Sequence, residues 1–140
     1  MSDHAATIAH AVGRLNEGDV DGYVTDLYHP HARFHGFPEA FGDDRDGIAG
    51  FFRALVAAVP DATIAAEDLF VAGDRVAVRF TLTGTHRGDL LGAAPDGQAL
   101  RVGGITILRF EGDRCAERWN RLDDVTLLAQ LGLFPAATAA

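Results

Sequence analysis

The sequence predicts an α+β fold in which helices cover one face of a curled antiparallel sheet. The first observation is a change of period, because apolar residues recur every three or four positions before Pro60 and every second position after Thr63. The second is the order of the elements: three helices and one short strand, then four strands and a closing helix. Helices gathered on one face of a sheet define this class. Long strands under few helices predict a cone with a pocket between the layers.

Three amphipathic helices are expected before residue 60. Their apolar stripes are Ile8, Val12 and Leu15; Val20, Tyr23, Val24 and Leu27; and Ile48, Phe51, Phe52, Leu55, Val56 and Val59. Each stripe follows the 3.6-residue period of a helix with one buried face. Asp19 can cap the second helix, and Gly18, Pro30 and Pro60 mark ends.

The strands follow from alternation and turn signals. We expect them at 31–36, 63–72, 75–86, 100–110 and 114–122, with the closing helix at 125–131. Gly73-Asp74 is a two-residue hairpin signal, and Glu111-Gly112-Asp113 turns the chain between the last two strands. The glycine- and proline-rich segment 92–97 is a longer connection.

Composition limits the class of protein. The 140 residues fit one domain, expected at 1–135, with a frayed tail at 136–140. A formal net charge of −8 argues against a nucleic-acid partner. No apolar run approaches the about 20 residues that span a membrane, and the N-terminus lacks a secretion signal. The single Cys115 cannot form an internal disulfide. We therefore expect a soluble, cytoplasmic protein.

The junction between the last strand and the closing helix holds a candidate acid or base. Asp123 follows a strand with a tryptophan and precedes a helix, so its carboxylate could point into the space between the layers. There its pKa could rise enough for general acid or base chemistry. The alternative is that Asp123 or Asp124 caps the helix. One of the two suffices as a cap, which leaves the other free.

Several short phrases carry a family resemblance. They are His35-Gly36; Ala-Val-Pro-Asp at 58–61; Ala-Gly-Asp-Arg-Val at 72–76; Gly-Thr-His-Arg-Gly at 84–88; residues 104–110; and Glu117-x-Trp119-Asn120-x-x-Asp123 with Gln-Leu-Gly at 130–132. In this order the chain resembles the SnoaL-like polyketide cyclases, or ester cyclases, of the nuclear-transport-factor-2-like superfamily of α+β barrels.

The resemblance implies a cofactor-free and metal-free intramolecular aldol condensation of an anthracycline-type polyketide ester in antibiotic biosynthesis, a carbon-acid reaction of the lyase or isomerase type. The family's acid/base is the aspartate four residues after the tryptophan, here Asp123. One desolvated carboxylate suffices, because a methylene between carbonyls is already acidic. This chain departs from the family pattern at 94–97, where Pro-Pro-Thr-Gly is usual, and at Thr106, where the family often has an acidic residue.

Two histidines are further catalytic candidates. His86 shares strand parity with Val78 and Phe80, so it could face the pocket and polarise a carbonyl, unless a bulge at Gly84 reverses that facing. Its alternative is an exposed strand-end histidine. His35 is implied by the resemblance as a second carbonyl contact near Asp123, with a surface turn histidine as the alternative. No regular spacing supports a metal site with His29 and His31, so no metal or cofactor is expected.

The pocket wall is expected to be aromatic and aliphatic. Trp119 has the parity of Asp123 and could raise its pKa. Arg121 on the same face would lower that pKa, unless Arg121 pairs with Glu117 or an irregular strand end turns it to solvent. Thr106, Leu108 and Phe110 from a strand and Phe51, Phe52 and Leu55 from a helix are candidate substrate contacts. Core packing is the alternative for Trp119 and for each of these six.

Other functions and a partner surface are also consistent with the sequence. A non-catalytic small-molecule-binding or dimerisation domain is one alternative to a cyclase acting on an aromatic polyketide-like molecule. An epoxide hydrolase is another, since Arg-x-Asp occurs at Arg87 and at Arg121. Ile105, Ile107 and Ala77 among arginines predict a homodimer or tetramer through the exposed sheet face.

Overall fold

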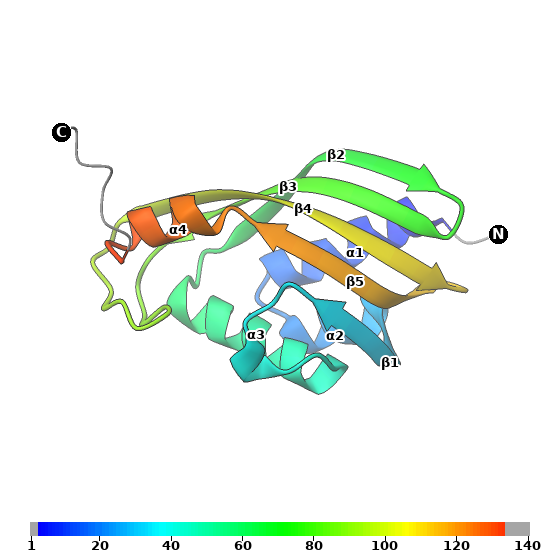
Figure 1. Ribbon diagram of the computed structural model, residues 1–140, viewed down its shortest axis with the longest axis horizontal. Coiled ribbons are helices and arrows are strands. Elements are labelled where there is room, and N and C mark those ends of the chain that lie inside the picture. The colour runs from blue at the N-terminus through cyan, green and yellow to red at the C-terminus, as the bar shows by residue number, and fades with distance from the viewer. Residues whose placement is uncertain (1–2, 134–140) are drawn as a thin grey trace.

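The computed structural model describes residues 3–133 and confirms the predicted α+β class (Figure 1). The helices α1 (His4–Asn16), α2 (Val20–Leu27) and α3 (Arg45–Ala58) lie on one face of a five-stranded sheet. A short 3-10 turn, η1 (Glu39–Phe41), precedes α3, and α4 (Asp124–Gln130) follows the last strand. The tail expected at 136–140 lies outside the described residues.

The sheet has the order β1-β5-β4-β3-β2. Its strands are β1 (Tyr28–His35), β2 (Thr63–Ala72), β3 (Arg75–Thr85), β4 (Ala99–Glu111) and β5 (Arg114–Leu122). The last four form the expected antiparallel meander, whereas β1 pairs in parallel with β5. The sheet is therefore mixed, and β1 begins at Tyr28 rather than after Pro30. An edge strand tolerates proline because that residue's missing N–H need not pair.

Aspartates begin the helices. Asp19 caps α2 as predicted, since its Oδ1 accepts a hydrogen bond from the Gly22 N–H at 2.9 Å. Asp44 caps α3 in the same way, through the Gly47 N–H at 2.8 Å. These bonds satisfy N–H groups that have no partner within the helix.

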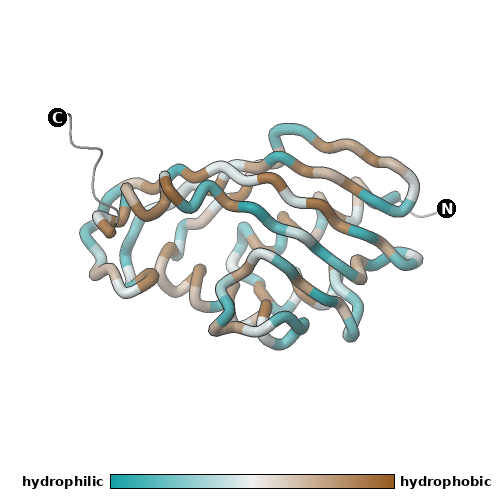
Figure 2. Tube along the Cα trace, viewed as in Figure 1, coloured by the Kyte–Doolittle hydropathy of each residue, from teal (hydrophilic) through white to brown (hydrophobic). Residues whose placement is uncertain are grey.

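The core lies between the helices and the concave, or inner, face of the sheet. In β3, Val76, Val78 and Phe80 are buried on this face, while Arg75 and Arg79 point outward. Figure 2 shows the alternation along the sheet and the apolar character of α3. Gly104 sits opposite Phe80 and leaves room for its ring, since a side chain there would overlap the ring atoms.

The opposite, or outer, face carries a row of residues across all five strands. The pairings align Phe70, Ala77, Ile107, Trp119 and His35. Phe70 is 68% exposed and Ile105, in the next row, is 57% exposed. Among residues 3–133, none of the helices has the length and apolar content to cross a membrane.

Candidate functional site

An apolar cavity of about 200 Å³ lies between α3 and the inner face of the sheet, at the end where α4 begins. It is lined by α3, by β3 to β5, by the segment after β1 and by α4. Apolar lining residues include Phe37, Phe51, Phe52, Leu55, Phe80 and Leu127. Such a hollow, mostly apolar with a few polar groups, is the usual form of a small-molecule site.

Two polar side chains reach this cavity from β5. Arg118 and Asn120 both line it, although they are only 9% and 6% exposed. Arg118 also lines a second hollow beneath α1, so its guanidinium stands between the two spaces. Gly36 lies against the Asn120 backbone with φ +89°, a conformation and a closeness that require glycine.

A β-bulge explains why these two residues face inward. Phe110 of β4 pairs with Cys115, and Arg109 pairs with Glu117, which leaves Ala116 as an extra residue in β5. An extra residue reverses the facing of those that follow. The bulge also sets Arg109 opposite Glu117, and the two form an ion pair with Nη2 and Oε1 3.3 Å apart.

The predicted position of Trp119 in the pocket wall is therefore wrong. Trp119 lies on the outer face, where its ring stacks on His35 with centroids 5.5 Å apart. The Arg75 guanidinium lies 5.3 Å from the Trp119 ring centroid. Arg121 is exposed and donates to the Asn120 carbonyl at 2.8 Å, so it turns to solvent rather than pairing with Glu117.

Arg118 is held by neutral oxygens alone. Its Nε donates to Thr106 Oγ1 at 2.8 Å, and its Nη1 donates to the hydroxyls of Tyr23 at 3.0 Å and Tyr28 at 2.7 Å. Its Nη2 donates to Asn120 Oδ1 at 3.1 Å. We call these five residues the Arg118 cluster. Within the described part of the chain, Arg118 takes part in none of the ion pairs.

The cluster carries one positive charge. Burial raises the pKa of Tyr23 and of Tyr28, although the Arg118 cation opposes the shift, so both phenols stay protonated at neutral pH. Burial by itself would lower the pKa of Arg118, but its contacts with Tyr28 and Tyr23 raise the pKa above the usual value. The guanidinium therefore remains a cation inside the protein.

Carboxylates gather where α4 begins, and the two adjacent aspartates are placed differently. Asp124 and Asp89 line the cavity. Asp123 is exposed and caps α4: its Oδ1 accepts from the Thr126 N–H at 3.2 Å and its Oδ2 from Thr126 Oγ1 at 2.6 Å. These two bonds lower the pKa of Asp123. The predicted raised pKa is wrong, because both oxygens accept bonds that favour the charged form.

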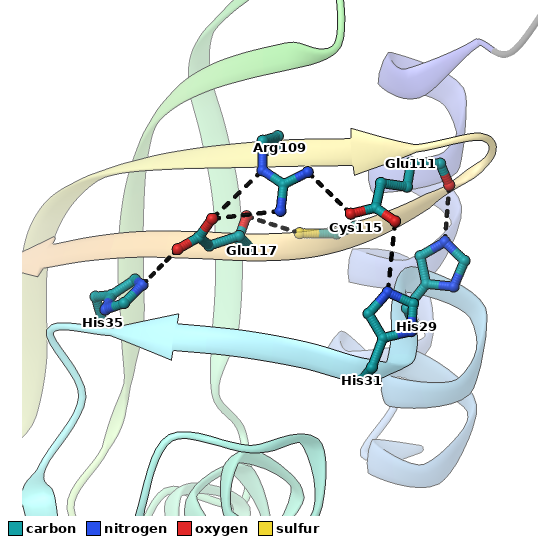
Figure 3. Close-up of polar contacts among 7 residues, drawn as sticks. All are labelled: His29, His31, His35, Arg109, Glu111, Cys115 and Glu117. Carbon is teal, nitrogen blue, oxygen red and sulfur yellow. Dashed lines mark hydrogen bonds and ion pairs between the residues drawn. The ribbon is translucent and has the colours of Figure 1, made fainter.

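His35 lies on the outer face, beside Glu117 (Figure 3), and is not among the residues that line the cavity. Its Nε2 is 2.7 Å from Glu117 Oε2, and Glu117 also contacts Arg109. The hydrogen bond with His35, followed by that with Arg109, lowers the pKa of Glu117. The prediction that His35 contacts a substrate carbonyl beside Asp123 is therefore wrong. The register of β1 with β5 sets His35 opposite Trp119, on the outer face.

His86 is inside the protein but does not line the cavity. Its side chain is 1% exposed, and Nδ1 is 3.6 Å from Asp96 Oδ1. Neither ring nitrogen has a hydrogen-bond partner among residues 3–133. Its backbone holds the 88–98 loop, since its N–H donates to Gln98 and its carbonyl accepts from Gly97. The alternative of an exposed histidine is wrong, and a substrate role stays a prediction.

The six expected contact residues separate into two groups. Phe51, Phe52 and Leu55 of α3 line the cavity. Thr106 and Leu108 instead line the hollow beneath α1, and Phe110 is buried against the His4 ring. Thr106 serves as a partner of Arg118, as described above. Substrate contact by any of them remains a prediction.

The histidines of β1 contact β4 instead of grouping around a metal. His29 Nε2 lies 2.7 Å from the Glu111 carbonyl, and His31 Nε2 lies 3.5 Å from Glu111 Oε1 (Figure 3). In the stretch from Asp3 to Leu133, no group of three His, Cys, Asp or Glu side chains could hold a metal ion.

The Arg-x-Asp sequences do not assemble an epoxide-hydrolase network. Arg87 and Arg121 are both exposed. Of these two arginines, neither forms an ion pair with any described residue. Activation of water by an Asp-Arg-Asp network needs the three side chains in contact.

Sequence reasoning missed the Arg118 cluster. Strict alternation from Trp119 put Arg118 and Asn120 on the outer face. Two signals could have revealed the bulge. Cys115 and Ala116 are adjacent small apolar residues that interrupt the alternation, and only a shifted register sets Arg109 opposite Glu117. Opposite charges in facing positions stabilise a strand pair.

The cone-shaped sheet, its helical cover and the cavity between them define the nuclear-transport-factor-2-like class of α+β proteins. The sequence profile of the family described as SnoaL-like polyketide cyclase matches residues 6–131. The chain belongs to the SnoaL-like polyketide cyclase family. Among curated proteins, no sequence matches it.

Solved structures agree with this assignment. IdmH from Streptomyces antibioticus, assigned as a candidate polyketide cyclase, is 32% identical with a TM-score of 0.79, covering 93% of this chain and 99% of IdmH. TsrD from Streptomyces laurentii is 28% identical with a TM-score of 0.84, covering 96% and 100%. AclR from Streptomyces galilaeus, a candidate hydroxylase, is 25% identical with a TM-score of 0.83, covering 94% and 97%.

Proposed function

We propose that this protein is a polyketide cyclase that catalyses an intramolecular aldol condensation on a polyketide ester without a cofactor, in the cytoplasm and in antibiotic biosynthesis. Membership of the SnoaL-like family supports the reaction class. The observation that carries the proposal is the apolar cavity with carboxylates where α4 begins and a cation in its wall. Ring systems suit the apolar wall, and proton transfer needs the carboxylate.

The reaction needs one proton acceptor and a fixed conformation of the substrate. A carboxylate removes a proton from the methylene between two carbonyls, and the resulting enolate carbon attacks a carbonyl carbon of the same molecule. The new alkoxide then takes the proton back from the carboxylic acid, so no atom is gained or lost. Holding the two reacting carbons together supplies much of the rate enhancement, and the proton transfer supplies about 10²–10⁴-fold.

The acid/base belongs to the Asp123–Asp124 pair in this proposal. Asp123 is the aspartate that the family resemblance assigns, and its lowered pKa keeps it ionised but makes it a weak base. Asp124 lines the cavity, while Asp123 serves as the helix cap. The two adjacent side chains thus divide the roles of cap and base.

The cavity volume limits what can be enclosed. About 200 Å³ is below the roughly 300–1,000 Å³ typical of sites for drug-sized ligands. A ligand of several rings would therefore place one part in the cavity and extend past Leu91 and Asp124, which both line it and are both exposed.

Asparagine substitutions test the proposal. Turnover of an aromatic polyketide methyl ester would be followed by absorbance and mass spectrometry for wild type, Asp123→Asn, Asp124→Asn and the double variant. We expect turnover to fall at least about 100-fold in the double variant. One of the two single variants should show the same loss, and that variant identifies the base. Asp113→Asn, at the exposed β4–β5 turn, is the matched control. Wild-type turnover in the double variant would overturn the assignment of the base.

A chain that binds the ester but does not turn it over would instead be a non-catalytic binding domain. The exposed position and lowered pKa of Asp123 are the features that favour this second function. Isothermal titration with the same ester separates the two, because binding is measured independently of turnover.

A further inference from the structure

The Arg118 guanidinium is a buried cation whose protein partners are all neutral. Its four hydrogen bonds go to Thr106, Tyr23, Tyr28 and Asn120, and its Cζ lies 5.3 Å from the Phe37 ring centroid. A buried charge is costly unless an opposite charge balances it. Removing water also strengthens its attraction for an anion. An anionic group in the cavity would therefore be attracted strongly.

The cluster leaves donors for such a group. A guanidinium has five N–H bonds, and four are used, so one N–H on Nη2 remains. Asn120 Oδ1 accepts from that same Nη2, which orients the amide. Across residues 3–133, Asn120 Nδ2 donates to no protein acceptor, and both side chains line the cavity. One charged N–H on Arg118 and the two N–H bonds of the neutral Asn120 amide thus remain without protein acceptors among the described residues, on two residues that line one apolar space.

We propose that Arg118 and Asn120 form an oxyanion-binding site in the wall of the cavity, and that the ligand selected by this chain carries an ionised oxygen on a planar apolar ring system, as a phenolate or an enolate. The inference rests on the proposed function and deepens it, because an enolate is the species that the condensation forms. Donors aimed at a developing oxyanion in a dry site are strong contributors to catalysis. Three N–H groups remain, one on Arg118 and two on Asn120, and these suit one oxygen better than a carboxylate, which has about four acceptor positions to satisfy.

The charges around the cavity orient the ligand. Arg118 and Asn120 are buried in the wall, whereas Asp89 and Asp124 are exposed at its lining. Water and salt screen the exposed carboxylates more than the buried cation. The ionised oxygen would thus point toward Arg118, with another part of the ligand toward Asp124. In this orientation, an acidic C–H of the substrate would lie near Asp123 and Asp124.

A chromophoric phenol tests the site without any turnover. 4-Nitrophenol fits a small cavity, and its phenolate absorbs at longer wavelength than its phenol. Absorbance titrations over pH would be recorded with wild type, Arg118→Met, Arg118→Lys and Arg121→Met. We expect wild type to bind the phenolate, so that the bound probe ionises at lower pH than the free one. Arg118→Met should abolish this and weaken binding at least about tenfold, or about 1.4 kcal/mol.

The other variants are matched controls. Arg118→Lys keeps the charge and should retain part of the phenolate preference, and Arg121→Met removes an exposed arginine of the same strand and should behave as wild type. Circular dichroism establishes that each variant is folded. If Arg118→Met does not fold, a competition experiment with wild type takes its place, in which 4-nitrotoluene competes against 4-nitrophenol. This neutral isostere should bind at least about tenfold more weakly than the phenolate.

Two results would overturn the inference: a bound probe in the phenol form, or equal binding by wild type and Arg118→Met. Its failure is separable from that of the cyclase proposal. Loss of turnover in the aspartate variants with no role for Arg118 in phenolate binding removes only the oxyanion site. Phenolate binding that depends on Arg118, without turnover of any ester, removes only the cyclase.

Discussion

The two faces of β5 each carry a charged side chain, but only the outer one has oppositely charged partners among the residues that the structure describes. On the inner face, Arg118 is buried and contacts neutral oxygens only. On the outer face, Glu117 lies between His35 and Arg109 in a network of mutually compensating charges (Figure 3). The outer network extends along the hairpin, where Arg109 also pairs with Glu111 at 3.0 Å.

The charges of the outer face are balanced within the protein, whereas the charge of Arg118 remains available to a ligand. Exposed ion pairs contribute little to stability because water already solvates their members. A buried cation among neutral groups keeps its full demand for a counter-charge. The outer face therefore has its charges compensated within the protein, whereas the inner face keeps one that a ligand can compensate.

The largest effect is expected from placing a charge on the outer face, which should dissociate a dimer formed through it. We propose a homodimer through the rows that contain Ile105, Ile107 and Ala77. Ile105→Glu sets a carboxylate between Arg79 and Arg121, so the monomer should stay folded. Each buried isoleucine contributes about 1.5–3 kcal/mol, so a symmetric dimer should weaken at least about 100-fold. Sedimentation at micromolar concentration measures this, with Val125→Glu as the control. A monomeric wild type would contradict the dimer.

A smaller effect, on the free energy of unfolding, is expected from removing one hydroxyl group of the Arg118 cluster. Tyr28→Phe removes an acceptor of Arg118 and the partner of Tyr23 at 2.6 Å. A hydrogen bond to a charged group contributes about 1.5–3 kcal/mol, so urea unfolding should show a loss of that size. His35→Gln breaks a half-exposed pair on the outer face and should cost less than about 1 kcal/mol. Equal losses would remove the contrast between the faces.

The smallest effect is a pH dependence of the outer network. Contacts with His35 and Arg109 lower the pKa of Glu117 in the folded protein. Its stabilising contribution is therefore present above the unfolded pKa of about 4.3 and is lost as pH falls through the folded pKa. Glu117→Gln should be less stable than wild type at pH 7, by less than about 1 kcal/mol, and equal to it near pH 3.

Urea unfolding at several pH values measures this difference. Glu67→Gln is the control, since Glu67 is exposed on β2 and outside the network in Figure 3. A difference between wild type and Glu117→Gln that persists unchanged at pH 3 would contradict the sign of the shift.

Much of the fold was predictable from local patterns. The helix stripes, the Asp19 cap and the Gly73-Asp74 hairpin each depend on a few neighbouring residues, and the structure has them where expected. The parallel pairing of β1 with β5 was not predictable, because it joins segments about 80 residues apart whose contact no local period records. The early start of β1 at Tyr28 follows from its edge position, which is also a tertiary property.

The site was predicted in part. Phe51, Phe52 and Leu55 line the cavity because a helix stripe determines its own face. Trp119 was misplaced and Arg118 was missed because one extra residue at Ala116 reverses everything that follows in β5. His35 was misplaced because the parallel register of β1 with β5 sets it beside Trp119. The roles of the two aspartates also needed the structure, since either residue has the chemistry to cap α4.

By itself, the sequence determined the class of the fold, the family and the apolar face of each helix, because these depend on periodicity and on residues close in the chain. Three features depend on contacts between distant segments: which charges of β5 are buried, which aspartate lines the cavity and where the histidines point. Those outcomes depend on strand register, and register is set by pairing between distant segments, where a shift of one residue exchanges the two faces of a strand.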